Sequence, residues 1–164
     1  LSKHLPSGTL DKISDSIKNG KKITKADYDI LMVVFKKSDK QLNAKPFIQS
    51  KPSSKVLDAN MKKANKKVPK YKHAAHHIVA GTAPKAQPAR AIFLKYRIDI
   101  NDEANGIYLP TDKTVTERTY HPSLHTNYYY EAVNQLIVAA QSREDVFDIL
   151  EYIYDELEND TFNK

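Results

Sequence analysis

The 164-residue chain contains no cysteine, and this absence excludes several kinds of site. Without cysteine there is no disulfide framework, no thiolate zinc site and no cysteine nucleophile. No stretch approaches the roughly 18–20 consecutive apolar residues that span a bilayer, so we expect no integration into a membrane. The first residues, Leu1 to His4, lack both an initiator methionine and the pattern of a secretory signal. We therefore expect a segment of a longer polypeptide.

Positive and negative charges are distributed unevenly along the chain. The net charge is +6, but residues 1–75 carry 18 lysines and 6 acidic residues, whereas residues 76–164 carry 8 basic and 14 acidic residues. The densest basic run, residues 51–72, holds eight lysines and one aspartate. Such a run favours polyanions through counterion release, without reading base sequence. The alternative interpretation is a solvated charged face.

The spacing of apolar residues predicts a mainly helical α+β fold. The expected helices cover residues 14–18, 25–36, 56–67, 89–97, 122–140 and 143–158, and the expected strands cover residues 73–80 and 107–109. Residues 46–56 are predicted to form a linker. Thr24 with Asp27, and Ser142 with Asp145, have the spacing of helix capping boxes.

Hydrophobic residues make up 40% of the chain, which suffices for one core. The length fits one domain, or a small domain with an extension. We expect residues 1–50 to form an N-terminal helical extension, which either aids delivery or completes the core. In residues 51–164, two short strands and a following helix provide the parts of a compact ββα unit.

Four of the six histidines fall into two close groups, His76 with His77 and His121 with His125. Neighbouring side chains on a strand point to opposite faces, but at a strand end or bulge both can approach one site. Pro122 favours the first position of a helix. His121 is therefore predicted at the N-cap and His125 in the first turn on the same side. Two imidazoles four residues apart can share a metal ion.

These histidine groups suit the hydrolysis of a phosphodiester bond. A divalent cation holds the scissile phosphate and stabilises the charge on the leaving 3′ oxygen. A neutral imidazole, oriented by a backbone carbonyl, takes the proton from the attacking water. A helix N-terminus beside the site also favours an anion. The other two histidines, His4 and His73, are interpreted as incidental.

Several short segments combine into a pattern that is specific as a whole. The segments are Ala75-His76-His77-Ile78-Val79-Ala80, Ala89-Arg90, Ile98-Asp99-Ile100-Asn101, Asn105-Gly106-Ile107-Tyr108-Leu109-Pro110, His121-Pro122-Ser123-Leu124-His125 and Tyr128-Tyr129. Together they resemble the HNH/endonuclease VII superfamily, and most closely its AHH branch, which is common as the toxin tip of bacterial polymorphic toxins. The resemblance spans residues 55–140. It implies a ββα-metal (His-Me finger) core, whereas residues 1–50 and the acidic tail match nothing in that family. With the helices expected from apolar spacing, the fold is this core with an N-terminal helical extension and a C-terminal helix, and residues 51–164 are predicted to form the nuclease domain.

The resemblance also implies roles for individual residues. His76 would be a metal ligand, His77 the general base and His125 the second ligand. His121 would be the third ligand, as in the nuclease colicins, unless the geometry at the N-cap turns its ring away. Asn105 would complete the catalytic set, either by bracing the loop between the strands or by approaching the metal.

Nucleic-acid contacts are predicted from the basic residues near this pattern. The lysines expected to bind are Lys62, Lys63, Lys66, Lys67 and Lys72. Arg90 contacts phosphate or forms a surface or structural salt bridge. The tyrosines at positions 128–130 are expected to be packing residues, with at most one beside the nucleic acid.

The function predicted from these residues is a metal-dependent DNA endonuclease with little sequence preference. It would act as a bacterial antagonistic toxin, secreted or delivered into the cytoplasm of a target cell. The metal would be magnesium or manganese, while an all-histidine shell also suits zinc or nickel. An acidic immunity protein would cover residues 51–72 or the active-site cleft.

Two alternatives remain open on the sequence alone. One is a ribonuclease on the same scaffold. The other is a non-catalytic nucleic-acid-binding module in which the histidines hold a structural zinc ion. Structural zinc sites usually recruit cysteine, which this chain lacks, and they do not need an extra histidine beside a ligand.

Overall fold

A computed structural model describes residues 8–41, 47–115 and 117–164. Only the backbone is described for residues 35–41, and the side chains are described for the others. His4 and the first residue of the predicted linker lie outside this part of the chain. The elements are α1 (Thr9–Lys18), α2 (Lys25–Gln41), α3 (Ser54–Lys63), β1 (His73–His77), η2 (Pro84–Ala86), α4 (Gln87–Lys95), η3 (Glu103–Asn105), β2 (Gly106–Pro110), η4 (His121–Leu124), α5 (Asn127–Ile137) and α6 (Arg143–Glu158), where η marks a 3-10 helix. The predicted mainly helical α+β fold is confirmed. None of the described helices has the length and apolar character needed to cross a bilayer.

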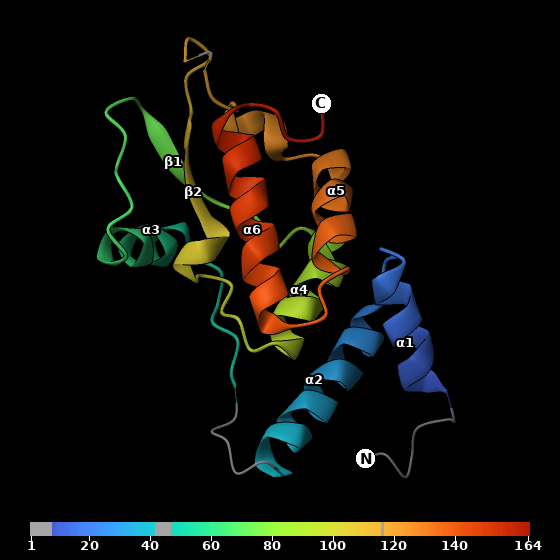
Figure 1. The fold of residues 1–164 in the computed structure, drawn as a ribbon. Coiled ribbons are helices and arrows are strands. Elements are labelled where there is room, and N and C mark those ends of the chain that lie inside the picture. Colours follow the sequence, from blue (N-terminus) through green and yellow to red (C-terminus); the bar gives the residue numbers. More distant parts are fainter. Residues whose placement is uncertain (1–7, 42–46, 116) are drawn as a thin grey trace.

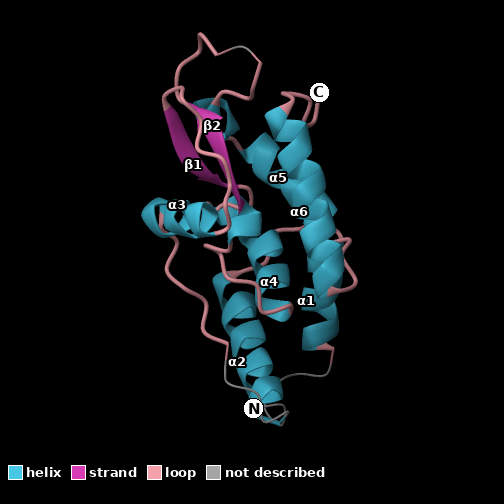
Figure 2. Cartoon of the chain, turned by 60° about the vertical axis from the view of Figure 1, so that its left-hand side comes forward, coloured by secondary structure: helices cyan, strands magenta, loops and turns pink. Residues whose placement is uncertain are grey.

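The β1–β2 hairpin lies between α3 and the remaining helices. In Figure 1, α3 and the hairpin form the left of the molecule, α5 and α6 lie side by side to their right, and α1 and α2 form the lower end. Figure 2 shows α3 crossing near the foot of the two strands. The two strands followed by η4 and α5 provide the ββα unit that the sequence predicts.

Side chains that alternate along β2 pack against different parts of the protein on the two faces of the hairpin. The strands are antiparallel, with His76 opposite Ile107 and His77 opposite Gly106. Ile107 belongs to the main hydrophobic cluster, whereas the next residue, Tyr108, packs with α3 in a smaller cluster. Since successive side chains on a strand point to opposite faces, the two histidines leave the hairpin in different directions.

Gly106 permits the close approach of α3 to the hairpin. A Cβ atom at this position would lie 2.5 Å from Met61 Sδ and 2.8 Å from Leu57 Cδ1, and both of these side chains are fully buried. Only glycine leaves room for α3 here. Gly106 is also the residue paired with His77, so α3 packs directly against the hairpin at the position of this histidine.

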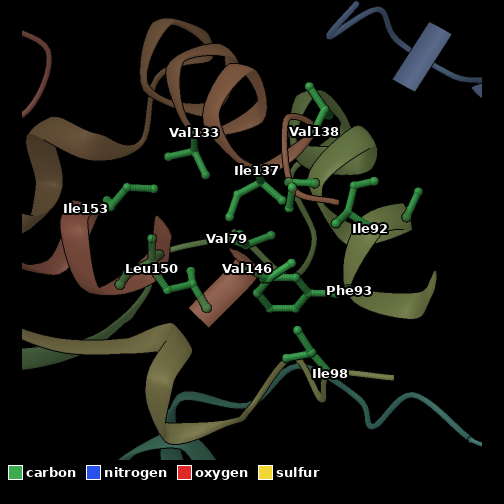
Figure 3. Packing of buried hydrophobic residues seen from close by; sticks show 14 of the residues in the cluster. Val79, Ile92, Phe93, Ile98, Val133, Ile137, Val138, Val146, Leu150 and Ile153 are labelled. Carbon is green, nitrogen blue, oxygen red and sulfur yellow. The ribbon is translucent and has the colours of Figure 1, made fainter. Parts of the chain in front are cut away.

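The main core forms where α4, α5 and α6 meet below the hairpin. Phe93 of α4 lies among apolar side chains from the other two helices and from the segments on either side of α4 (Figure 3). The labelled members are Val79, Ile92, Phe93, Ile98, Val133, Ile137, Val138, Val146, Leu150 and Ile153. Each fully buried aliphatic or aromatic side chain of this kind contributes roughly 1.5–3 kcal/mol relative to an exposed one. This core supports the hairpin and η4 from beneath.

The N-terminal helices contribute to the same core. Ile13, Ile17, Ile23 and Leu31 are buried members of the main cluster, and α1 and α2 both contact α4. The capping box at Thr24 is present: the Asp27 amide donates to Thr24 Oγ1 (3.1 Å) and the Thr24 amide donates to Asp27 Oδ2 (3.2 Å). The division of the chain at residue 50 stays a prediction.

The single long helix predicted over residues 122–140 is wrong. Residues His121–Leu124 form a 3-10 helix instead, with Tyr120 rather than His121 at its N-cap. Thr126 then adopts an extended conformation and its side chain accepts the amide hydrogen of Tyr129, which starts α5 as a separate helix. Threonine is favoured at N-caps, so Thr126 was the available signal. His125 lies in the link between the two helices.

Two other predicted elements end earlier than expected. The basic helix predicted over residues 56–67 stops at Lys63, because Asn65 takes a left-handed conformation (φ 62°). The Lys66 amide then donates to the Met61 carbonyl, as in a Schellman cap. The first strand ends at His77, where the Ile78 amide donates to the Asn105 carbonyl (2.8 Å). At Ser142 the predicted N-cap is present, with the Asp145 amide donating to Ser142 Oγ, but Asp145 Oδ2 accepts the amide hydrogen of Gln141 (2.8 Å) and so does not complete a capping box with Ser142.

Candidate active site

Three histidines, from β1, from η4 and from the link after η4, form one cluster. The ring of His76, on β1, lies 5.1 Å from the ring of His121 and 6.1 Å from that of His125, measured between centroids. The rings of His121 and His125 are 4.7 Å apart. Although the predicted helix is a 3-10 turn here and is broken after His125, η4 and the following link still bring both rings to the same place. One nitrogen from each residue lies within 4.8 Å of the others.

The chemistry of this donor set fits a divalent metal ion. Imidazole nitrogens bind zinc, nickel and related ions when they are neutral. His76 is only 4% exposed. Burial, together with the nearby His121 and His125, lowers the pKa of His76 well below its ordinary value. Burial also lowers the pKa of His121, with a further contribution from His125. Both rings are thereby kept in the neutral form that a metal requires.

His77 is not a member of this cluster, and its ring is held by a buried asparagine. His77 Nε2 lies 2.9 Å from Asn101 Oδ1. The orientation of the amide is set by two backbone groups: Asn101 Nδ2 donates to the Lys51 carbonyl, and Asn101 Oδ1 accepts the Ser53 amide, both at 2.9 Å. Since the oxygen can only accept, His77 Nε2 carries the proton and donates. The lone pair of His77 is therefore on Nδ1.

The partner of His77 differs from the one predicted. A backbone carbonyl was expected to orient the base, whereas the structure places the side-chain oxygen of Asn101 there. Burial lowers the pKa of His77, and the hydrogen bond to Asn101 offsets part of this effect. A lowered pKa favours the neutral imidazole near pH 7, the form that can accept a proton.

The residues before α3, which were predicted to belong to a linker, pack beside Asn101 and hold it in place. Gln49 pairs with the backbone beside this asparagine, donating to the Ile98 carbonyl (3.0 Å) and accepting the Ile100 amide (2.7 Å). Pro52 crosses Gly81 so closely that a Cβ atom on the glycine would collide with it. These residues therefore join the backbone beside Asn101 to the loop at the edge of the site.

His77 and the histidine cluster open into one groove of about 560 Å³. Its walls come from β1, the loop over residues 80–83, α3, and the region around η4. His73, which was interpreted as incidental, also lines the groove, and its ring packs edge-on against Tyr108 at 5.1 Å. Strand alternation was the available signal, because it puts His73 on the same face of β1 as His77. The packing of α3 against β1 then decides that this face lines the groove.

The wall that α3 forms carries two lysines and one aspartate. Lys55 and Lys62 both line the groove with Asp58. Lys62 Nζ lies 2.7 Å from Asp58 Oδ2, and the Tyr108 hydroxyl donates to Asp58 Oδ1 at 2.7 Å. The bond from Lys62, followed by that from Tyr108, lowers the pKa of Asp58. Burial, reinforced by the same carboxylate, raises the pKa of Tyr108 to about 12. Lys55 was not among the predicted contacts.

The structure places the predicted lysines on several surfaces. Of these five lysines, all of which are described, Lys62 alone lines the groove. Lys63 lies on another side of α3, and Lys67 lines a separate hollow beside Tyr71 and Tyr154. Lys66 Nζ donates to the carbonyls of Glu103 (2.6 Å) and Gly106 (2.9 Å), so it holds the start of β2. Lys72 is exposed beside β1.

Arg90 holds the loop over residues 80–83, which forms one wall of the groove. One guanidinium nitrogen, Nη1, donates to the carbonyls of Ala80 and Ala83, each at 2.8 Å. These two residues bound the loop that lines the groove. Of the predicted alternatives for Arg90, the structure describes a structural role, made through backbone carbonyls rather than through a salt bridge.

Asn105 braces the same region from the interior. Its side chain is fully buried, and its Oδ1 accepts the Val79 amide at 2.7 Å. Its Nδ2 donates to the carbonyls of Val79 (3.1 Å) and Ile100 (2.9 Å). Asn105 therefore ties the turn after His77 to the segment that ends in Asn101. Of the two predicted alternatives, the contacts match a brace for the loop.

The three consecutive tyrosines have different surroundings. Tyr129 is buried and its hydroxyl reaches His76, Tyr130 lines the groove, and Tyr128 is 69% exposed. Burial raises the pKa of Tyr129, so its hydroxyl keeps its proton. The prediction of packing residues missed the contact with His76, which is 53 positions away in the sequence.

A hairpin and a following helical segment that bring three histidines together beside a fourth define the ββα-metal class of nucleases. A family model described as a nuclease family of the HNH/ENDO VII superfamily with conserved AHH matches residues 57–157. This match covers more than half of the chain, so the protein belongs to that family, and Ala75, His76 and His77 supply the AHH. Comparison with curated proteins and with solved structures gave no match. The protein is thus a nuclease, a phosphodiester hydrolase.

Proposed function

We propose that this nuclease is a metal-dependent DNA endonuclease with little sequence preference. The observation that carries the proposal is the position of His77, which opens into the same groove as the cluster of His76, His121 and His125. A base and a set of metal ligands on one groove are what hydrolysis of an unactivated phosphodiester requires.

The residues of the chain divide this work. His76, His121 and His125 would hold the cation, and their three nitrogens leave room for further ligands. When bound, a divalent cation supplies Lewis-acid stabilisation of the charge that develops on the phosphate and the leaving oxygen. His77 accepts one proton of the attacking water at Nδ1, while the water oxygen bonds to phosphorus and the bond to the 3′ oxygen breaks. The leaving 3′ oxygen takes up a proton from solvent water. The products carry a 5′-phosphate and a 3′-hydroxyl.

Substrate binding is assigned mainly to backbone phosphates. Lys55 and Lys62 stand on the α3 wall, facing the same groove as the histidines. Lysine binds phosphate as a point charge and does not report the identity of a base. The other predicted lysines and Arg90 stay candidates for more distant contacts or for support of the fold.

Cleavage of supercoiled plasmid by the purified protein tests the proposal. We expect no cleavage in EDTA, and nicking followed by linearisation when magnesium, manganese, zinc or nickel is restored. His121→Ala should lower activity because it removes one candidate ligand. His73→Ala, which removes a groove histidine outside the cluster, is the matched control and should stay within a few-fold of the wild type.

A parallel RNA substrate decides between the two nucleic acids. Preferential RNA cleavage would replace the DNA assignment with the ribonuclease alternative. Binding of DNA without cleavage under any of the four metals would favour the non-catalytic module. Cleavage that persists unchanged in EDTA would contradict metal dependence.

We further propose that the nuclease serves as an antagonistic toxin, delivered into the cytoplasm of a target bacterium. The resemblance to toxin tips and the basic surface near the groove support this role. An acidic immunity protein in the producing cell would cover residues 51–72 or the groove. Its charge would complement Lys55 and Lys62, which line that groove.

Expression of the chain in the bacterial cytoplasm is expected to stop growth and to fragment the chromosome. The inactive His77→Ala variant, expressed to the same level, should leave growth unchanged. Normal growth with intact DNA, despite demonstrable nuclease activity in the purified protein, would argue against the toxin role while leaving the enzymatic assignment in place.

A further inference from the structure

A chain of two hydrogen bonds links the first histidine of the AHH to a tyrosine on α5. His76 Nε2 lies 3.1 Å from the Tyr129 hydroxyl, and that hydroxyl lies 2.9 Å from the carbonyl oxygen of Ile78. Both side chains are almost completely buried, so water cannot take the place of either partner.

The direction of these hydrogen bonds follows from proton counting. A tyrosine hydroxyl has one hydrogen to donate, and the Ile78 carbonyl oxygen can only accept. Tyr129 therefore donates to Ile78, and the lone pair of its oxygen faces His76. His76 must then donate from Nε2, which places its lone pair on Nδ1. In the opposite tautomer, His76 Nε2 would carry a lone pair. This lone pair would either face the lone pair of the Tyr129 oxygen or compete with the Ile78 carbonyl for the one hydroxyl hydrogen, inside the protein.

We propose that Tyr129 is a positioning residue for the metal site: it selects the tautomer of His76 that presents Nδ1 as the ligand atom. Metal-bound histidines commonly donate their other ring nitrogen to an oxygen acceptor, which fixes the ring and its tautomer. Here the acceptor is a phenol that a backbone carbonyl has itself oriented. The proposal rests on the metal site proposed above.

The backbone and the ring of Tyr129 are both held in place by neighbouring residues. Its amide donates to Thr126 Oγ1, which places it in the first turn of α5. Its ring packs against those of Tyr130 and Phe162, each at 5.8 Å between centroids. The break between η4 and α5 has a consequence for the site, because the cap at Thr126 sets the position of the hydroxyl. His125 precedes this cap directly, so one short segment supplies both a candidate ligand and the residue that orients another.

The tautomer can be measured in the metal-free protein, without any activity. Long-range ¹H–¹⁵N correlation spectra distinguish protonated from unprotonated ring nitrogens, and the His76→Ala variant assigns the signals. We expect His76 to be protonated at Nε2 above the range in which its ring titrates. In Tyr129→Phe, which keeps the ring but removes the hydroxyl, we expect a mixture of both tautomers.

Metal affinity supplies the second readout. Titration calorimetry with zinc, and the visible absorption of the cobalt-loaded protein, should show a 10–100-fold weaker site in Tyr129→Phe, the range typical of a lost partner of this kind. Tyr130→Phe is the matched control: it removes a hydroxyl from the next residue, which lines the groove without bonding to His76, and should change the affinity less than twofold.

Distinct results would overturn the proposal. A wild-type His76 protonated at Nδ1 would contradict it, and this holds even where Tyr129→Phe does not fold. An unchanged zinc affinity in folded Tyr129→Phe would show that the hydroxyl does not position the ligand. If the tautomer is as expected but the wild type neither binds a metal nor cleaves DNA, the proposed function fails instead.

Discussion

Replacement of His77 by alanine is expected to slow plasmid cleavage by roughly 10²–10⁴-fold, the range that a positioned general base contributes. Zinc affinity and melting temperature should stay close to those of the wild type. The reason lies in the geometry: His77 faces Asn101, whereas the candidate ligands His76, His121 and His125 form a separate cluster. The variant removes the base and leaves that cluster intact. Cleavage assays, calorimetry and thermal unfolding of the same preparation check each part.

The neighbourhood of His77 explains why its loss should be tolerated by the fold. Asn101 keeps two partners, the Lys51 carbonyl and the Ser53 amide, and loses only the imidazole. A structural zinc ligand would behave differently, because its removal lowers the melting temperature in step with metal binding. Retained cleavage in His77→Ala would contradict the assignment of the base. A parallel loss of metal and stability would instead favour the binding module.

Replacement of Asn105 by alanine is expected to have the largest effect on stability. The change leaves the Val79 amide and the carbonyls of Val79 and Ile100 without the partner they have inside the protein. Each unsatisfied buried group costs about 1–3 kcal/mol. We therefore expect a loss of roughly 3 kcal/mol or more in the free energy of unfolding. The melting temperature should fall by roughly 6–12 °C.

A second buried asparagine separates the local effect from general destabilisation. Asn134 also spans two backbone groups, donating to the Lys85 carbonyl (2.6 Å) and accepting the Ala89 amide (3.3 Å), but it takes no part in the histidine sites. Asn134→Ala should lower the melting temperature while keeping cleavage per folded molecule. Asn105→Ala should lower both, since it releases the turn after His77. Equal residual activity in the two variants would refute a bracing role specific to the site.

Local sequence signals determined most of the secondary structure and the identity of the site. The capping box at Thr24 and the N-cap at Ser142 appear as predicted, because the interacting groups are three residues apart and need no other part of the chain. The helical breaks at Asn65 and Thr126 were also local, but they depend on a weak preference of a single residue. The AHH pattern identified the family for a related reason. Its chemistry requires particular residue types at neighbouring positions, and these can be recognised in the amino-acid sequence alone.

Tertiary structure alone decided which side chains serve the histidines. His77 meets Asn101 across 24 positions, and His76 meets Tyr129 across 53. Lys62 and Lys66 lie four residues apart in one basic run, yet the first lines the groove and the second is bound to two carbonyls near β2. The spacing of apolar residues along the sequence does not predict such differences, because they arise when α3, the hairpin and α5 pack together. The sequence by itself determined which residues could carry the chemistry. The packing of distant elements decided which of them are held, in which tautomer, and facing which partner, since a hydrogen bond depends on position in space and not on separation along the chain.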